Sequence, residues 1–283
     1  MKPKKIAWVA DFVVKTYKAG GAQYTNEMVI NAGRDKGYNI DIITKDDTPG
    51  YDYDLYILNN IRYINIDFLN EIIYKKNYIR WEHDYWVCGA YKHDKKFTGI
   101  LENSLLNLFM SKRHIAECEK DIDFKIPNKN YVVSPIDTDL FFIDKKIKKD
   151  KNLVVWTGHD KPDNKGFETV MQYAKASPKL KFKMFGIFKE EHDLPDNVEI
   201  IGEVDQPIFA RSLQKAQYLM AVPNWIEPSG RSVLEGLLCG CDLIVNDNIG
   251  VLSEKIDFND YKKIVELAHS EDKFWDMVEK ISE

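Results

Sequence analysis

The chain has 283 residues, of which 44% are hydrophobic and 30% charged, and this composition excludes a disordered or fibrous protein. A chain of this length can form two modest domains or one large one. Its formal net charge of −5 excludes an attraction of the whole protein to nucleic acid or to an anionic membrane.

The N-terminal sequence MKPKKIAWVADFVV begins with positive charges and continues with apolar residues, as a signal peptide does. Asp11 interrupts the apolar run and no small-residue cleavage site follows, so we predict a buried first strand there. No apolar run reaches the roughly 18 residues that a membrane-spanning helix needs. The four cysteines (Cys88, Cys118, Cys239 and Cys241) are too few and too scattered for a disulfide framework. We therefore predict a reduced, cytoplasmic protein without a transmembrane segment.

Short apolar strands alternate with helix-length segments along the whole chain. We predict strands at residues 4–11, 39–44, 54–60, 77–84, 105–111 and 130–135 in the first half, and at 152–158, 179–186, 197–204, 217–224 and 241–247 in the second. These runs are nearly continuous in apolar residues, which is typical of strands covered on both faces, as in a parallel sheet.

Amphipathic segments lie between the strands, for example residues 22–37 and 165–177. In the second of these, Phe167, Val170, Met171 and Ala174 fall on one helical face. Strand–helix–strand repetition implies right-handed crossovers and a doubly wound sheet. The strands are too numerous for one open sheet, so we predict two Rossmann-like α/β domains with doubly wound parallel sheets facing a central cleft.

A charged stretch at residues 142–151 separates the two similar sets of strands. It contains KKIKKDK, which we interpret as a solvated linker and not as a nucleic-acid site, because no aromatic residues are interleaved with the lysines. The predicted domains are residues 1–145, on the acceptor side, and 146–270, which bind the ligand described below. Helical patterns occupy 260–270 and 271–283, and the last helix is expected to pack back on the first domain.

The stretch PNWIEPSGRSVLEGLLCGC follows the strand that ends at Asn224. A helix is expected to begin between Ser229 and Ser232, so the turn before it lies beyond the carboxyl end of a strand, where open α/β sheets bind ligands. Free N–H groups at a helix N-terminus attract anions such as phosphate, and Gly230 allows a ligand to approach the backbone.

Two glutamates flank this turn. Residues Ser232 to Glu235 fit a capping box, which explains Glu235 about as well as ligand binding does. A capping box does not explain Glu227, which precedes the turn. Two acids beside an anion-binding turn suggest a ligand with hydroxyls on both sides of a phosphate, as in a nucleotide sugar.

The segment EPSGRSVLEGLLCG resembles the E-x7-E signature of retaining glycosyltransferases with the GT-B fold, especially family 4. Other segments resemble that family in the same order along the chain: GGAQ (20–23), HDYWVC (83–88), IDTDLF (136–141), WTGHDKPDNKGF (156–167) and GVLSE (250–254). The resemblance implies transfer of a sugar, with retention of configuration, from a UDP-, GDP- or ADP-linked donor to a glycan, glycolipid or other hydroxyl acceptor.

The resemblance also implies roles for individual residues. Glu235 would bind the ribose hydroxyls, Glu227 would lie beside the transferred sugar, and Lys165 would neutralise the diphosphate. His83 would lie near the reacting sugar. The predicted catalytic residues are Glu227, His83 and Lys165, and the predicted donor-binding residues are Gly20, Gly21, His159, Ser229, Gly230, Arg231, Ser232 and Glu235.

Each assignment has a plainer alternative. Gly20 and Gly21 fit an ordinary strand–helix turn, Lys165 is one of 40 basic residues, and His83 fits a satisfied strand-end histidine. The chain also departs from the family pattern. His159 stands where the family usually has arginine, so one phosphate-binding cation is weaker at neutral pH, and Arg231 replaces an apolar residue and is the candidate to compensate.

No metal or cofactor is expected besides the nucleotide-sugar substrate. Transferases of another fold hold a metal with Asp-x-Asp, but the motif at Asp52 precedes a strand and the one at Asp137 lies at the domain-closing turn. We instead expect Lys165, helix N-termini and the glycine loop to hold the leaving group.

Three alternative functions remain. A nucleotide-sugar epimerase or dehydrogenase needs a G-x-G-x-x-G that the first strand–helix turn lacks. A second rival is a non-catalytic sugar-nucleotide-binding subunit of a glycan assembly machine. A third is a transferase with DNA bases as acceptor, against which the acidic balance counts. Base contacts are expected from the loops after Gly186 and Gly202, and nothing in the sequence specifies the base or the oligomeric state.

Overall fold

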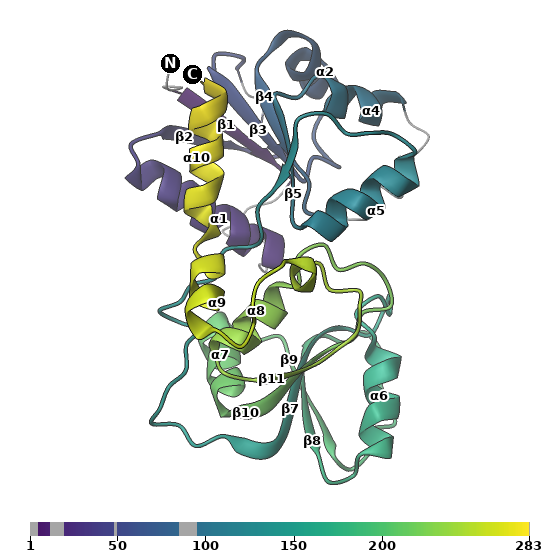
Figure 1. Ribbon diagram of the computed structural model, residues 1–283. Coiled ribbons are helices and arrows are strands. Elements are labelled where there is room, and N and C mark those ends of the chain that lie inside the picture. The colour runs from purple at the N-terminus through teal and green to yellow at the C-terminus, as the bar shows by residue number, and fades with distance from the viewer. Residues whose placement is uncertain (1–4, 12–19, 48–49, 85–94, 283) are drawn as a thin grey trace. The chain divides into compact units, whose positions relative to one another are not determined.

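The computed structural model describes residues 5–11, 20–47, 50–84 and 95–282 (Figure 1). Contacts divide the chain into two compact units. Unit 1 contains Met1–Pro135 and His269–Glu283, and unit 2 contains Ile136–Ala268. The divisions predicted from the sequence were at residues 145/146 and 270/271.

Unit 1 is built on a parallel sheet of six strands in the order β2-β1-β3-β4-β5-β6. The strands are β1 (Lys5–Ala10), β2 (Asn39–Ile43), β3 (Leu55–Asn59), β4 (Tyr78–Trp81), β5 (Leu106–Phe109) and β6 (Lys129–Tyr131). The helices are α1 (Gly21–Asp35), α2 (Ile66–Lys75), α4 (Lys95–Glu102), α5 (Lys112–Ile122) and α10 (Ser270–Ser282). Five of the six strands lie within the apolar runs that predicted them, whereas β6 begins one residue before its predicted run at 130–135 and covers only the first two residues of it.

Both faces of this sheet are buried. Trp8 of β1 packs with α1 and α10 on one face, whereas its neighbour Val9 packs with α2 on the other. The last helix is fixed against α1 because Gly33 has no side chain: a Cβ there would lie 2.1 Å from Cζ2 of Trp275. The Trp275 indole also donates a 2.8 Å hydrogen bond to the carbonyl of Val29. The continuous apolar runs are therefore explained by a sheet covered on two sides.

Unit 2 is built on a parallel sheet of five strands in the order β11-β10-β7-β8-β9. The strands are β7 (Asp150–His159), β8 (Lys181–Ile187), β9 (Val198–Gly202), β10 (Ala216–Ala221) and β11 (Asp242–Val245). The helices are α6 (Phe167–Ala176), α7 (Gln206–Lys215), α8 (Arg231–Leu238) and α9 (Tyr261–Ala268), with a 3-10 turn η1 (Val251–Ser253). The predicted apolar face of α6 is confirmed, since its four residues are all buried.

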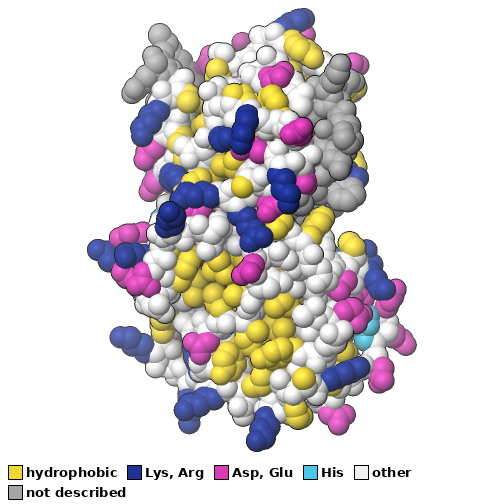
Figure 2. All heavy atoms as spheres, turned by 45° about the vertical axis from the view of Figure 1, so that its right-hand side comes forward, with side chains coloured by type: hydrophobic (Ala, Val, Ile, Leu, Met, Phe, Trp, Pro, Cys, Tyr) yellow, Lys and Arg dark blue, Asp and Glu magenta, His cyan; other side chains and the backbone are white. Residues whose placement is uncertain are grey.

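The prediction of two parallel-sheet α/β units is therefore confirmed. In the described part of the chain no helix combines the length and apolarity needed to cross a bilayer. On the face drawn in Figure 2, basic and acidic side chains are interspersed, in keeping with the small net charge.

The cysteine prediction needs a correction. Cys239 and Cys241 are free, as expected, and both are buried, but Cys118 is disulfide-bonded. The prediction of four reduced cysteines is therefore wrong for Cys118, and Cys88 lies outside the described residues. Sequence spacing did not reveal this bond because cysteines pair according to their distance in the folded chain.

Candidate functional site

The loop that follows β7 in unit 2 carries Lys165. Its carbonyl accepts a 3.3 Å hydrogen bond from the indole nitrogen of Trp156, so the loop folds back over its own strand. Gly158 permits this approach, because a Cβ there would lie 2.7 Å from Cβ of Lys165. The lysine is therefore held at the carboxyl edge of the sheet.

Lys165 meets Glu227 there. Its Nζ forms an ion pair with Oε2 of Glu227, although the two residues lie 62 positions apart. The lysine side chain is 33% exposed and the glutamate 20%, so the pair is open to solvent on one side. The backbone of Glu227 is fixed by hydrogen bonds of 2.8 Å to the Asn248 carbonyl and from the Gly250 N–H. Two predicted catalytic residues are thus in direct contact.

The turn before α8 has the geometry that a glycine requires. Gly230 is the N-cap with φ of 85°, a left-handed conformation, and a Cβ there would lie 2.5 Å from Cγ2 of Ile249. The carbonyl of Ser229 accepts a 2.7 Å bond from the Val251 N–H, which ties the turn to the GVLSE segment. No side chain caps the helix.

Arg231 and Glu235 form a second ion pair on the first turns of α8. The Nε of Arg231 lies 2.8 Å from Oε1 of Glu235, and the two side chains are only 11% and 7% exposed. Burial raises the pKa of the Glu235 carboxyl, and the guanidinium opposes that shift. The helix begins at Arg231 with Gly230 as N-cap, so the capping box from Ser232 to Glu235 is not formed and that alternative is wrong.

His159 ends β7, where the family pattern has arginine. Burial lowers the pKa of His159, and the charge of Lys165 lowers it further. Both effects favour the neutral form of the ring at pH 7, so His159 contributes little positive charge to this edge.

Asp160, the next residue, was not predicted. It is 1% exposed, and its carboxylate accepts hydrogen bonds of 2.9 Å from the Lys189 N–H, 3.0 Å from the Glu190 N–H and 2.9 Å from Nε2 of His192. Burial alone would raise the pKa of Asp160, but these donors outweigh it and the pKa lies below its ordinary value. We call this set the Asp160 clamp. It fixes the loop after β8, where base contacts were expected.

In unit 1, Gly20 and Gly21 lie at the N-terminus of α1, beyond the carboxyl end of β1. Both are exposed, and the Gly20 N–H donates a 3.1 Å hydrogen bond to Oε1 of Gln23. This is the turn that the sequence predicted, and its geometry fits both the ligand loop and the ordinary strand–helix turn.

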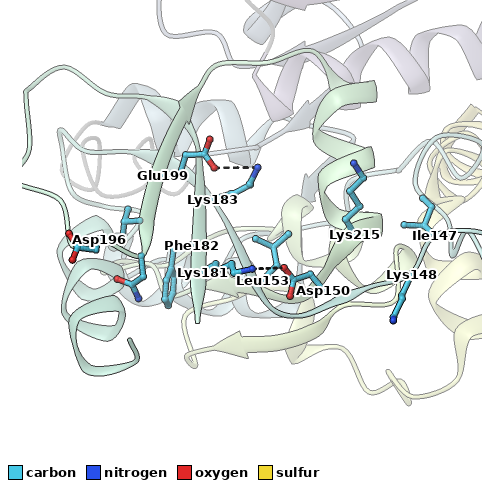
Figure 3. A pocket seen from close by; sticks show the side chains of 12 residues that line it. Ile147, Lys148, Asp150, Leu153, Lys181, Phe182, Lys183, Asp196, Glu199 and Lys215 are labelled. Carbon is cyan, nitrogen blue, oxygen red and sulfur yellow. Dashed lines mark hydrogen bonds and ion pairs between the residues drawn. The ribbon is translucent and has the colours of Figure 1, made fainter. Parts of the chain in front are cut away.

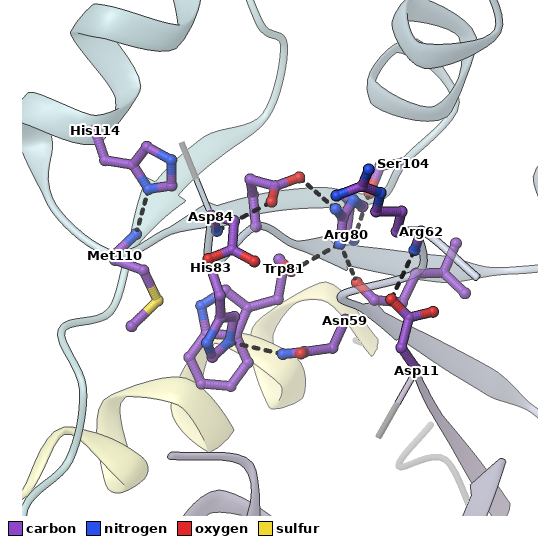
Figure 4. Close-up of polar contacts among 12 residues, drawn as sticks. Asp11, Asn59, Arg62, Arg80, Trp81, His83, Asp84, Ser104, Met110 and His114 are labelled. Atoms are coloured by element: carbon purple, nitrogen blue, oxygen red, sulfur yellow. Dashed lines mark hydrogen bonds and ion pairs between the residues drawn. The ribbon is translucent and has the colours of Figure 1, made fainter. Parts of the chain in front are cut away.

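His83 follows β4 in unit 1 and is 7% exposed (Figure 4). Its Nε2 lies 2.7 Å from Nδ2 of Asn59, at the end of β3, and the Oδ1 of Asn59 accepts a 3.2 Å bond from Nδ2 of Asn26 on α1. The indole ring of Trp81 packs on the imidazole at 4.5 Å between centroids. Burial lowers the pKa of His83 to about 3, and Arg80 and His114 contribute to the shift.

A buried ion pair lies on the opposite face of the same strand. Arg80 and Glu82 are both 1% exposed and bond to each other. The guanidinium also donates to the carbonyls of Leu58 at 2.8 Å and Trp81 at 2.7 Å. Burial raises the pKa of Glu82 to about 7, against the lowering effect of the Arg80 charge. Figure 4 shows Arg80 close to the strand end that bears His83, and the sequence analysis did not predict its ion pair with Glu82.

A cavity of about 500 Å³ in unit 2 lies at the opposite, amino edge of the sheet (Figure 3). Lysines project around it, but Lys181 is paired with Asp150 and Lys183 with Glu199, each at 3.3 Å. Because ligands of open α/β sheets bind at the carboxyl edge, we assign this cavity no part in the candidate site.

No group of three or more metal-ligating side chains occurs among the described residues. One carboxylate of each Asp-x-Asp motif accepts a hydrogen bond from a backbone N–H. Asp54 accepts a bond from the Lys5 N–H at 2.9 Å, and Asp137 accepts one from the Asp139 N–H at 3.0 Å.

No protein-family model matches the sequence, and no curated protein is significantly similar to it. Solved structures are similar over nearly the whole chain. That of HepE from Anabaena in complex with UDP and glucose has a TM-score of 0.70 at 13% identity, covering 98% of this chain and 97% of that one. Sucrose-phosphate synthase from Thermosynechococcus elongatus has a TM-score of 0.70 at 15% identity, covering 98% and 96%.

An α-glucosyltransferase in complex with UDP-glucose and DNA containing an abasic site has a TM-score of 0.61 at 11% identity, covering 98% and 95%. At these identities the likeness is one of fold. The chain has the GT-B fold.

Proposed function

We propose that this protein is a retaining glycosyltransferase of the family 4 type. It transfers a sugar from a nucleotide-sugar donor to the hydroxyl of a glycan, glycolipid or similar acceptor, and it needs no metal. The observation that supports this most directly is the contact between Lys165 and Glu227 beside the Gly230 turn of unit 2. Two residues that the sequence motifs assign to one ligand meet at the carboxyl edge of a sheet in a GT-B fold.

In this proposal Lys165 leaves its contact with Glu227 to bind the donor diphosphate, and Glu227 then accepts hydrogen bonds from the transferred sugar. Glu235 binds the ribose hydroxyls, while Arg231 and the N–H groups at the start of α8 bind phosphate oxygens. These preorganised donors stabilise the charge that develops on the leaving diphosphate, which is the role a metal has in other transferases. The acceptor hydroxyl attacks from the same face that the diphosphate leaves.

Thermal-shift titration against UDP, GDP, ADP and their sugar conjugates tests donor binding. A matching nucleotide should stabilise the protein by about 2.7 kcal/mol at a hundredfold excess over its dissociation constant. Lys165→Ala should weaken binding by about 10- to 100-fold, because it removes hydrogen bonds between charged groups that are each worth about 1.5–3 kcal/mol. Lys183→Ala is the control, since Lys183 is also an ion-paired lysine of this sheet but lies at the amino edge.

An equal loss of affinity in both lysine variants, or no binding of any nucleotide by the wild type, would refute the proposed donor site. Turnover in excess EDTA tests the metal-independent mechanism separately. Loss of turnover that returns on addition of Mg²⁺ or Mn²⁺ would refute that part alone.

The second candidate is a non-catalytic sugar-nucleotide-binding subunit. The lowered pKa of His159 favours this candidate, because the neutral ring supplies no positive charge to bind a donor phosphate at the carboxyl edge of the sheet. Such a subunit would bind the nucleotide sugar as described but would not release free nucleotide from it, with or without acceptor.

A further inference from the structure

Three polar side chains from three elements of unit 1 form a hydrogen-bonded chain. Asn26 on α1 donates to Asn59 at the end of β3, and Asn59 donates to Nε2 of His83 after β4. Asn26 is 3% exposed and Asn59 0%. The side chains therefore cannot exchange these bonds for bonds to water, and we call them the Asn26–Asn59–His83 chain. Figure 4 shows its contact between Asn59 and His83.

The donor-to-acceptor direction of the Asn26–Asn59–His83 chain determines which nitrogen of the His83 ring carries the proton. A neutral imidazole has one N–H donor and one acceptor, and Nε2 is the acceptor when the Asn59 amide donates to it. The proton then resides on Nδ1. In the described part of the chain no residue hydrogen-bonds Nδ1 of His83.

Turning the Asn59 amide alone would place its NH₂ group against that of Asn26, two donors face to face. Turning both amides would reverse the chain and move the proton to Nε2. That arrangement buries the Asn26 amide nitrogen without an acceptor, whereas the present one leaves only its Oδ1 unpaired. An unpaired buried oxygen is tolerated better than an unpaired buried N–H.

The surroundings oppose a second proton on the ring. Trp81 covers it, and the charged and titratable groups that act on it are Arg80 and His114. Both groups lower the pKa of His83, in the same direction as its burial.

We propose that Asn26 and Asn59 are positioning residues that hold the His83 ring with its single proton on Nδ1, so that His83 donates a hydrogen bond to an oxygen of the substrate and does not act as a proton acceptor. This inference rests on the proposed transferase function for its substrate. The state of the ring itself can be measured in the protein alone.

Long-range ¹H–¹⁵N spectra of ¹⁵N-histidine-labelled protein distinguish the two tautomers and the imidazolium. The chain has six histidines, and the signals lost in His83→Gln assign those of His83. We expect the Nδ1–H tautomer at pH 7 and no titration down to pH about 5. The Nε2–H tautomer or an imidazolium in the wild type would overturn the proposal, and this measurement needs no folded variant at position 59.

Asn59→Asp replaces the donor with an acceptor at the same place. The proton should move to Nε2, and the ring should begin to titrate above pH 5 because it faces a carboxylate. Asn60→Asp is the matched control, since it adds the same charge one residue later without a bond to His83, and it should leave the tautomer unchanged. A shift in both variants, or in neither, would overturn the role of Asn59.

The transfer reaction tests the second half of the proposal. Asn59→Asp should lower kcat/KM by about tenfold, because His83 then loses its hydrogen bond to the substrate oxygen, worth about 1.4 kcal/mol. Asn60→Asp should leave kcat/KM unchanged. A moved proton with unaltered kcat/KM would refute the donor role. A wild type with no transferase activity at all would refute the proposed function while the spectra still decide the tautomer.

Discussion

The Asp160 clamp gives a stability prediction for unit 2. Asp160→Asn keeps the shape of the side chain and one oxygen for the three donors, and it removes the charge by replacing the other oxygen with an NH₂ group. A hydrogen bond to a charged group contributes about 1.5–3 kcal/mol and a neutral one about 0.5–1.5. The difference is about 1 kcal/mol per donor, so the variant should lose about 3 kcal/mol of unfolding free energy at pH 7.

The loss should depend on pH with a definite sign. The folded-state pKa of Asp160 lies below its ordinary value of 3.8, so its contribution is present above that pH and disappears as the pH falls through the folded-state pKa. The difference between wild type and variant should therefore be full at pH 7 and should shrink below pH about 4.

Urea unfolding at the two pH values measures this difference. Hydrogen exchange of the Lys189 and Glu190 amides measures it locally, as a loss of protection of up to about a hundredfold. Asp193→Asn is the control, since Asp193 is an exposed carboxylate near the same loop and its removal should change stability by less than about 0.5 kcal/mol. Equal stability of wild type and Asp160→Asn at pH 7, or a difference that grows at low pH, would refute the reasoning.

Two further predictions concern backbone and charge. In thermal unfolding, Gly166→Ala should destabilise the protein well beyond the about 1–2 kcal/mol expected for Gly37→Ala. Both glycines have a left-handed φ (81° and 85°), but only at Gly166, of these two, would a Cβ meet another atom, the Val222 carbonyl oxygen at 2.0 Å. Similar melting temperatures for the two variants would contradict this. Glu82→Gln should flatten the pH profile of stability. Because burial raises the folded-state pKa of Glu82 to about 7, protonation of this carboxyl stabilises the folded state. That contribution is complete below the ordinary pKa of 4.5 and is lost as the pH rises through 7. The prediction is wrong if the urea midpoint of the wild type, relative to that of Glu82→Gln, does not decrease from pH 5 to pH 8. That result would show that Arg80 keeps the Glu82 carboxylate ionised over this range.

The strands could be predicted from the sequence because their signal is local. A run such as NLVVWTG is apolar on both faces, and that alone identifies a strand of a covered parallel sheet. The buried face of α6 was predicted for the same reason, since Phe167, Val170 and Ala174 repeat at helical spacing. The start of α8 was found from Gly230 and the helical pattern that follows it.

The polar contacts around the site could not be predicted, because they depend on which strands are neighbours. Asn59 reaches His83 only because β3 pairs with β4 in the register that puts Asn59 beside Trp81. Asp160 reaches His192 because β7 and β8 are adjacent and end together at His159 and Ile187. Asn59 directly follows the apolar run LYIL, and Asp160 follows the run LVVW after three further residues. Such positions mark the carboxyl edge of the sheet but do not identify the hydrogen-bond partner.

The two units share an arrangement that explains why charge is buried beside the proposed functional groups. In unit 1 the Arg80–Glu82 pair lies under the strand end that carries His83, and in unit 2 the Asp160 clamp lies in the loop that carries Lys165. Apolar residues would give comparable stability at such positions, since a buried ion pair contributes little net free energy. Charged groups with several hydrogen-bond partners fix the directions of backbone groups, which apolar packing does not do. In unit 1 these are C=O groups of β3 and β4, and in unit 2 they are N–H groups of the loop after β8. We infer that this directional control, more than stability, is what the buried charges supply beside His83 and Lys165, the residues proposed above to bind the substrate.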